Sequence, residues 1–204
     1  MLTRKYLVSV GLITITLLAI AAIIWSKDET SLTPVAAPES EFWRGAEHAS
    51  ITIDVYPDFT CDICVEKEHM ALQALDIYPT KVKVVYHPYP SSEFGWKLAE
   101  SLEAAAEQGK FWELHDLFLA GVPGNMSELK AYAQQIGLDV NRFEEALNTD
   151  TFKERVELAK QEAVSQGVTR NAVFVNGTEY QHSPGTISDL RSTIDEELER
   201  LGKR

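Results

Sequence analysis

The pattern of apolar and polar residues predicts a strand–helix–strand unit in the first half of the chain. The stretch "SITIDVY" (50–56) alternates apolar and polar positions, as a strand with one buried face does. From Asp62 to Ile77 the apolar residues recur with a helical period, and the valine-rich "KVKVVYH" (81–87) predicts a second strand. A helix that connects two strands in this way is a common supersecondary unit.

A block of helices follows this unit, and the chain ends with a hairpin and one more helix. Residues 95–119 have a helical pattern with a break at Gly109, and a strand with a tight turn at Asn176–Gly177 precedes an amphipathic helix from Thr186 to Leu201. The layout is therefore α/β, with an all-helical insertion over about residues 93–167. Three helices are predicted between these segments: Asn125 or Ser127 to Gly137, Asp139 to Asn148, and Asp150 or Thr151 to Gly167.

The N-terminus has a different pattern, which predicts a single transmembrane helix. Residues 1–6 carry Arg4 and Lys5, and residues 7–25 contain no charged side chain. A helix of that length is about 28 Å long, which matches the apolar core of a bilayer. Under the positive-inside rule, residues 1–6 form a cytoplasmic stub. The rest of the chain would then lie on the periplasmic or extracellular side of the inner (cytoplasmic) membrane.

Two alternatives for residues 7–25 stay open, namely a cleaved signal peptide and a buried core helix. Against cleavage, the apolar run is long, and the one small-residue site places Pro38 directly after the cut. Residues 26–43 are rich in Ser, Thr, Pro, Ala and Glu and lack apolar periodicity, so we expect a flexible linker. The folded domain is then predicted to span residues 44–204.

Composition narrows the class of partner. Hydrophobic residues make up 45% of the chain and charged residues 25%, which is ordinary for a globular protein. The net charge of −12 argues against nucleic acid as a partner, because a phosphate backbone requires clustered Lys and Arg. We expect no bound metal and no cofactor.

The candidate chemistry lies in "DFTCDICVEK" (58–67), which contains both cysteines of the chain. A structural disulfide across two residues closes a very small loop and stabilises the fold little, and a zinc site needs about four ligands. A redox-active pair explains the position better. The N–H groups at the start of a helix would stabilise a thiolate at Cys61, which is then the nucleophile, and Cys64, one turn later, would resolve the mixed disulfide.

Several segments resemble the bacterial DsbA-like thioredoxin-fold oxidoreductases, in the subgroup that is often anchored to the membrane. They are "RGAEHASITIDVYPDFTCDIC", "VVYHPYP", "EQGKFWELHDLF", "YAQQIGLD" and "FVNG", in the family's order and within residues 44–201. The resemblance implies a thioredoxin-like fold with a helical insertion. It also implies thiol–disulfide exchange on cysteines of exported proteins, with a membrane partner that resets the pair.

The residues around the pair depart from this family. Asp58 and Phe59 flank the turn and are expected to shape it. Many relatives have proline after the first cysteine, and strong oxidants have histidine before the second, whereas this chain has Asp62 and Ile63. A negative charge beside Cys61 disfavours the thiolate, so we expect the pair to be less oxidising than strong periplasmic oxidants.

A second departure concerns the loop that binds substrate in this family. There, a cis-proline precedes the last strands, whereas this chain has Arg170, Asn171 and Ala172 in the corresponding loop. We predict that these three residues bind substrate. Because the proline is missing, an alternative function is a non-catalytic module that keeps the fold and binds a protein or a metal.

The third departure is Val55, which stands where relatives have a buried acid on the strand. The neighbouring Asp54 is predicted to be a solvated strand residue on the other face. His115, in "FWELHDLF", is predicted to pack between helices. His87 is placed at a strand end, and the remaining histidines are predicted to lie on the surface: His48, His69 and His182.

Overall fold

The computed structural model describes residues 42–182 and 185–202. The predicted cytoplasmic stub (1–6), the membrane helix (7–25) and nearly all of the linker (26–43) lie outside the described residues. Within the two described ranges, no helix is both long enough and apolar enough to cross a membrane.

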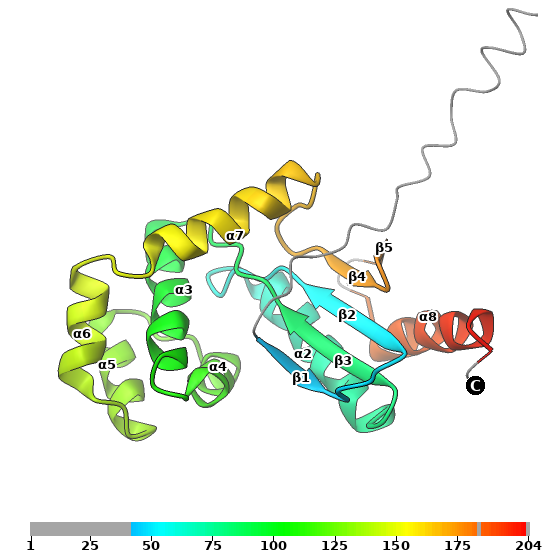
Figure 1. The fold of residues 1–204 in the computed structure, drawn as a ribbon, viewed down its shortest axis with the longest axis horizontal. Coiled ribbons are helices and arrows are strands. Elements are labelled where there is room, and N and C mark those ends of the chain that lie inside the picture. Colours follow the sequence, from blue (N-terminus) through cyan, green and yellow to red (C-terminus); the bar gives the residue numbers. More distant parts are fainter. Residues whose placement is uncertain (1–41, 183–184, 203–204) are drawn as a thin grey trace, which may run out of the picture. The chain divides into compact units, whose positions relative to one another are not determined.

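A five-stranded mixed sheet forms the centre of the domain (Figure 1). Its strands lie in the order β1-β3-β2-β4-β5, and β2 and β3 are parallel whereas the other neighbours are antiparallel. The parallel pair requires a crossover, which α2 (Asp62–Ile77) provides. The strands are β1 (Trp43–Gly45), β2 (Ile51–Val55), β3 (Val82–Tyr86), β4 (Val173–Val175) and β5 (Thr178–Glu179).

The first hydrophobic core lies between one face of this sheet and two helices, α2 and α8 (Ile187–Arg200). Alternate residues of β2 point into it, because successive strand side chains face opposite sides. Gly45 needs its φ of +122°, and a Cβ there would lie 2.5 Å from the carbonyl oxygen of Val82. The fully buried members of this core from β2 and the two helices are Ile51, Ile53, Val55, Ala71, Ala74, Leu190, Ile194 and Leu198.

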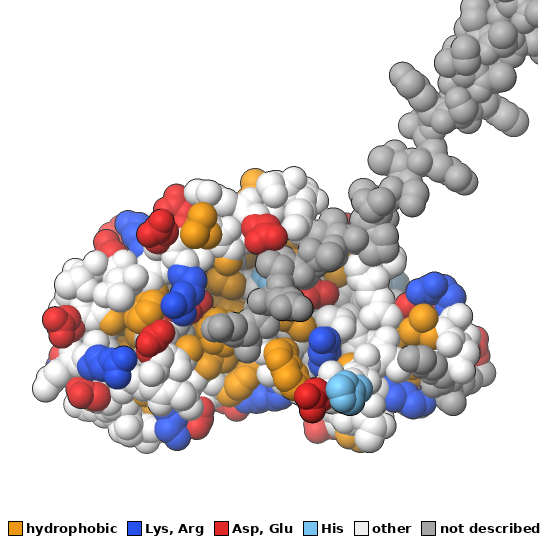
Figure 2. Space-filling view, viewed as in Figure 1, with side chains coloured by type: hydrophobic (Ala, Val, Ile, Leu, Met, Phe, Trp, Pro, Cys, Tyr) orange, Lys and Arg blue, Asp and Glu red, His pale blue; other side chains and the backbone are white. Residues whose placement is uncertain are grey.

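The helical insertion has a second core of its own. It contains residues from the ends of the first unit, Phe59 and Tyr86, so the insertion is packed directly against the turn that carries the cysteines. In Figure 2, hydrophobic side chains gather where this insertion meets β1. The helices are α3 (Glu93–Ala106), α4 (Phe111–Ala120), α5 (Met126–Gln135), α6 (Val140–Asn148) and α7 (Lys153–Ser165).

Most predicted elements are confirmed. The predicted helix from Asp62 to Ile77 has those bounds, the break between α3 and α4 occurs at Gly109 with a φ of +70°, and Asn125 and Asp139 cap α5 and α6. The thioredoxin-like α/β fold with a helical insertion is therefore present.

Two local predictions need correction. Helix α7 begins after Phe152, which forms no side-chain cap, and not at Asp150 or Thr151. Asp150 has a φ of 51° and binds Lys97 instead. The domain also begins before residue 44, because Trp43 belongs to strand β1 and the ring of Phe42 stacks on Phe111 with a centroid distance of 3.9 Å.

Candidate functional site

The two cysteines lie at the start of α2, at the edge of the sheet where the parallel strands β2 and β3 end. Cys61 is the N-cap residue, and its carbonyl accepts hydrogen bonds from the N–H groups of Cys64 at 2.9 Å and Val65 at 3.2 Å. The pair is disulfide-bonded, with a Cα–Cα distance of 5.3 Å. Cys61 is partly exposed and Cys64 is 1% exposed, so solvent reaches the first cysteine rather than the second.

Asp58 holds the turn that precedes the cysteines. Its carboxylate is 2% exposed and accepts hydrogen bonds from the N–H groups of Thr60 and Ser91, each at 2.9 Å. It connects the turn to the segment after β3. A Cβ on Gly95 would lie 2.9 Å from this carboxylate, so the first turn of α3 also approaches it closely. Phe59 is buried and packs edge-on against Phe118 of the insertion at 5.1 Å.

The dipeptide between the cysteines points to solvent. Asp62 is exposed and occupies the first turn of α2, where a carboxylate interacts favourably with the helix dipole. Ile63 is 43% exposed, which is unusual for a large apolar side chain and places a hydrophobic surface directly beside the disulfide.

The loop with the three residues predicted to bind substrate lies at the same edge of the sheet, between α7 and β4. The backbone of this loop forms hydrogen bonds within the chain. The N–H of Asn171 donates to Tyr56 and the carbonyl of Ala172 accepts from Tyr56, at 3.0 and 3.1 Å. Asn171 has a φ of +65°. The side chain of Arg170 donates to Ser91 at 2.8 Å, which joins this loop to the Asp58 turn.

A buried lysine supports the same loop. Lys67 of α2 is 6% exposed, and its Nζ donates to the carbonyl of Asn171 at 3.2 Å. Burial lowers the pKa of this ammonium, and the negative charge of Glu179 opposes the change. No local pattern selects Lys67, because its contact partner is 104 residues away.

His115 of α4 forms a buried ion pair with Glu68 of α2. The two side chains are 0% and 2% exposed, and His115 Nε2 lies 2.8 Å from Glu68 Oε1. The prediction that His115 packs between helices is correct, but its charged partner was not expected. Glu68 was detectable in principle, because it follows Cys64 by four residues and so lies on the same face of the predicted helix.

Electrostatics favour a charged imidazole at this position. Burial alone would lower the pKa of His115, but the neighbouring carboxylates of Glu68 and Asp116 outweigh burial and raise it above its usual range. For Asp116, burial opposes ionisation, but the close contact with His115 and the hydrogen bonds and charge of Arg44 lower its pKa to about 2.

A second buried pair corrects the prediction for Asp54. This residue is 8% exposed, not solvated, and its Oδ1 lies 2.9 Å from Nε2 of His87, which is 4% exposed. The ring of His87 stacks on Tyr56 at 4.6 Å. Asp54 does point to the opposite face from Val55, as predicted, but Tyr56, Phe174 and the end of α7 cover that face and exclude solvent.

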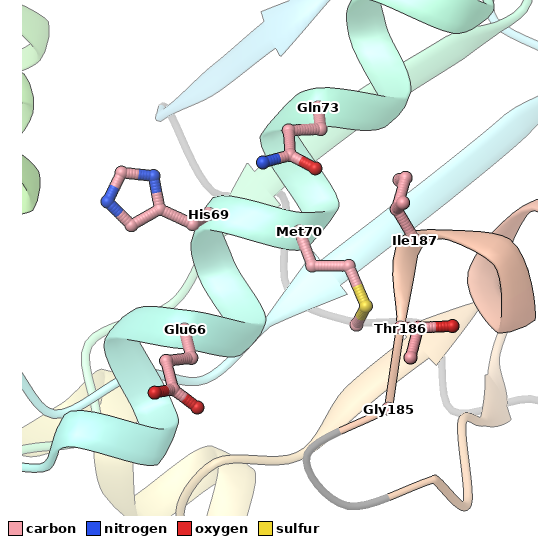
Figure 3. Close-up of a pocket in the computed structure, with 7 residues that line it drawn as sticks. All are labelled: Glu66, His69, Met70, Gln73, Gly185, Thr186 and Ile187. Carbon is pink, nitrogen blue, oxygen red and sulfur yellow. The ribbon is translucent and has the colours of Figure 1, made fainter.

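An open pocket of about 250 Å³ lies between α2 and the start of α8 (Figure 3). Met70 directs its thioether toward Gly185 and Thr186, whereas His69 points away from this loop. His69 is exposed, as predicted, and its ring binds the carbonyl of Leu119 at 3.0 Å. None of the residues that the sequence suggested for the site lines this pocket.

No group of three or more His, Cys, Asp or Glu side chains suited to a metal ion occurs within residues 42–182 and 185–202. Both cysteines are in the disulfide, and the described histidines that lie near carboxylates are paired with them.

Comparisons with known proteins identify relatives of this fold. A family model described as thioredoxin matches residues 38–196. Oxidised BdbD of Bacillus subtilis aligns with a TM-score of 0.69 at 17% identity, over 77% of this chain and 92% of that chain. Alpha-DsbA1 of Wolbachia pipientis aligns with a TM-score of 0.68 at 15% identity, over 78% of this chain and 90% of that chain.

A curated sequence relative has a different kind of name. The Na⁺/H⁺ antiporter NhaA 3 of Salinispora tropica is 34% identical over 165 residues, which are 77% of this chain and 24% of the antiporter. This chain thus spans about a quarter of the length of that relative. The match covers most of the present chain and a minor part of the antiporter.

Proposed function

The chain belongs to the thioredoxin family, and from this premise we propose that it is a thiol–disulfide oxidoreductase whose redox-active pair is Cys61 and Cys64. One observation carries the proposal: a partly exposed cysteine at the N-cap of α2 is disulfide-bonded to a buried cysteine one turn later. The N–H groups that open a helix stabilise negative charge, so a thiolate formed at Cys61 is both stabilised and accessible.

The reaction follows from this asymmetry. A thiolate of the substrate attacks Sγ of Cys61, the bond to Cys64 breaks, and Cys64 leaves with the electron pair. A second substrate thiol then displaces Cys61, so the substrate is oxidised and the pair is reduced. In the opposite direction, Cys61 attacks a substrate disulfide and Cys64 resolves the mixed disulfide.

We further propose the setting of this reaction. Substrates are cysteines of exported proteins, and a membrane redox partner resets the pair. Residues 7–25 anchor the chain as a single-pass protein with the domain on the periplasmic or extracellular side. Protease accessibility of the domain in intact spheroplasts tests this placement, since a cytoplasmic domain would be protected. We propose no ion transport for the chain, which spans only about a quarter of the matched antiporter.

Insulin reduction and refolding of reduced ribonuclease test the activity. We expect turnover by the wild-type chain, none by Cys61→Ser, and trapped mixed disulfides with Cys64→Ser. Equal and negligible rates for the wild type and Cys61→Ser would reject the oxidoreductase. The reduction potential, measured against glutathione, tests the weaker oxidising power proposed from Asp62 and Ile63. A potential as high as that of strong periplasmic oxidants would contradict it.

A non-catalytic binding module is the second candidate, and the loop before β4 favours it. The N–H and carbonyl groups of Asn171 and Ala172 are all engaged within the chain, since Ala172 also donates to Thr169 at 3.2 Å and Lys67 binds the Asn171 carbonyl. A substrate backbone that pairs with this loop would have to replace those bonds. Binding of a reduced partner peptide without any exchange would support this candidate.

A further inference from the structure

The ion pair between Glu68 and His115 requires an explanation, because it is buried in the apolar core of the insertion. Aromatic rings surround the imidazole, including Trp112 at 4.9 Å and Phe59 at 5.6 Å. Removing two charges from water costs several kcal/mol for each ion, and replacement of such pairs by apolar residues often leaves stability unchanged or improved. Stability alone therefore gives no reason for this pair.

Its position relative to the disulfide suggests a role. Glu68 follows Cys64 by four residues in α2, and both side chains are buried, so they lie on the same face of the helix. Side chains with this spacing have Cβ atoms about 5–6 Å apart. One oxygen of Glu68 binds His115, whereas Oε2 is buried without a hydrogen-bond partner among the described residues. A buried carboxylate oxygen without a partner in the described part of the chain thus lies on the same face of α2 as Cys64, one helical turn further along.

Further charged side chains lie between this pair and the surface of the domain. On the far side of the imidazole, Nδ1 of His115 lies 3.5 Å from Oδ1 of Asp116, whose side chain is 51% exposed; this ion-pair contact is not a hydrogen bond, and Nδ1 is buried without a hydrogen-bond partner among the described residues. Arg44 of β1 binds both oxygens of that carboxylate, each at 3.0 Å. A line of proton-binding groups therefore runs from Glu68 in the core, through His115, to Asp116 at the surface.

We propose that Glu68 and His115 exchange the proton of Cys64 during thiol–disulfide exchange. This inference rests on the oxidoreductase proposed above. When Cys64 attacks the mixed disulfide at Cys61, its S–H proton passes to Oε2 of Glu68, the new S–S bond forms, and the substrate leaves as a thiolate that is protonated by solvent. In the reverse direction, Glu68 returns the proton to Cys64 as it leaves. His115 connects Glu68 with Asp116, where the proton exchanges with solvent.

Other ionisable groups face the same region and belong in any interpretation of pH dependence. Burial raises the pKa of Tyr86 on β3 well above its usual range, and the carboxylates of Glu68, Glu103 and Asp58 raise it further. Lys67 neighbours Glu68 in sequence, but its ammonium is directed to the loop at Asn171. The imidazole of His115 remains the cationic group in direct contact with Glu68.

A chromogenic aromatic disulfide allows the reactions of the two cysteines to be measured separately. The reduced chain releases one coloured thiolate when Cys61 attacks and a second when Cys64 resolves, so the first phase depends on reagent concentration and the second does not. General acid–base catalysis contributes about 10²- to 10⁴-fold. We expect Glu68→Gln to slow the second phase by at least about tenfold, to flatten its pH profile, and to leave the first phase unchanged.

Three further variants complete the test. Asp54→Asn alters the other buried pair and Glu66→Gln alters an exposed carboxylate on the same helix, and both should keep the wild-type second phase. Asp116→Asn changes a surface residue, so it tests the relay even if Glu68→Gln does not fold. Because Asp116 raises the pKa of His115, its loss should move the break in the second-phase pH profile to lower pH.

The possible outcomes are distinguishable. A wild-type chain that is active on insulin, with second phases in Glu68→Gln and Asp116→Asn like those of the wild type, overturns the relay and leaves the oxidoreductase intact. Equal slowing by Asp54→Asn also overturns the relay, since it would indicate a general loss of packing. A wild type with two reagent phases but no turnover of proteins rejects the oxidoreductase while the variants still test Glu68.

Discussion

Two buried pairs of a carboxylate and a histidine lie on opposite sides of the central sheet. They contain the same kinds of side chain but lie in different surroundings, so comparing them shows what the surroundings contribute. Glu68–His115 and Asp54–His87 have nearly the same geometry, with N–O distances of 2.8 and 2.9 Å. Both are shielded from solvent by aromatic rings, which are Phe59 and Trp112 around one imidazole and Tyr56 stacked on the other. Residue type alone therefore does not distinguish them.

Their surroundings do distinguish them. Asp54 and His87 connect two adjacent strands, because Asp54 is in β2 and His87 follows β3 directly. They face away from α2, since Val55 on the opposite side of β2 belongs to the core against that helix. Glu68 lies in the same helix as the cysteines. Under our proposal, one pair joins two strands of the sheet while a similar pair serves a thiol.

Both pairs should contribute strongly to stability. Removal of Glu68 leaves the charge of His115 uncompensated, which costs about 3–5 kcal/mol, and removal of Asp54 leaves His87 buried without its hydrogen-bond partner, which costs about 1–3 kcal/mol. We therefore expect Glu68→Leu and Asp54→Leu to reduce the free energy of unfolding by about those amounts in urea titrations. A loss below about 1 kcal/mol for either variant would mean that its histidine is readily accommodated as a neutral group.

Double variants separate the effect on stability from the effect on chemistry. When Glu68→Leu is combined with His115→Leu, both charges are gone, and most of the lost stability should return. Combining Asp54→Leu with His87→Leu likewise removes both hydrogen-bonding groups of the other pair, so most of its lost stability should also return. The two double variants should then differ in chemistry, because only the one without Glu68 and His115 has a slow second reagent phase. If both resolve at the wild-type rate, the pairs are equivalent and neither serves Cys64.

The fold was largely predictable because its signals are local. The helical period of the apolar residues predicts the helix from Asp62 to Ile77, and Asn125 and Asp139 predict where two other helices begin. Each signal depends on neighbours within a few residues, and the structure confirms all three predictions. Strand β1 was missed because it has three residues and owes its conformation to pairing with β3, some forty residues further along the chain. A segment that short carries no pattern of its own.

The candidate site was predictable only at the cysteine turn. The motif places Cys61 and Cys64 without knowledge of the fold, whereas the partner of Lys67 is 104 residues distant and that of Glu68 is 47 residues distant. The error at Asp54 has the same origin. A polar residue that alternates with apolar ones suggests a solvated face, but the covering of that face comes from the end of α7.

A smaller effect concerns the dependence of stability on pH. The folded pKa of His115 lies above its unfolded value of about 6.5, because Glu68 and Asp116 outweigh burial. Its contribution to stability is therefore fully present below about pH 6.5 and is lost as the pH rises through the folded pKa. We expect the free energy of unfolding to fall over that window in the wild type. The decline should persist in His87→Gln, which keeps His115, and disappear in His115→Gln.

The smallest effect should come from the surface end of the relay, where the two pairs also differ. Arg44 and Asp116 are 35% and 51% exposed, so their ion pair is screened by solvent, and Arg44→Ala should cost no more than about 1 kcal/mol. Asp116 has a depressed pKa of about 2, so its stabilisation is present above its unfolded value of about 3.9 and is lost as the pH falls toward 2.

Arg44→Ala should therefore reduce the acid-dependent part of stability, measured by unfolding between about pH 2 and 5, and the reduction should shrink at high salt. Asp54→Asn is the matched control, since it changes a buried carboxylate and leaves Arg44 and Asp116 in place. A loss of several kcal/mol on Arg44→Ala would mean that this contact supports the packing of β1 against α4. In that case Asp116 would be a structural residue, and the line from Glu68 would end at His115.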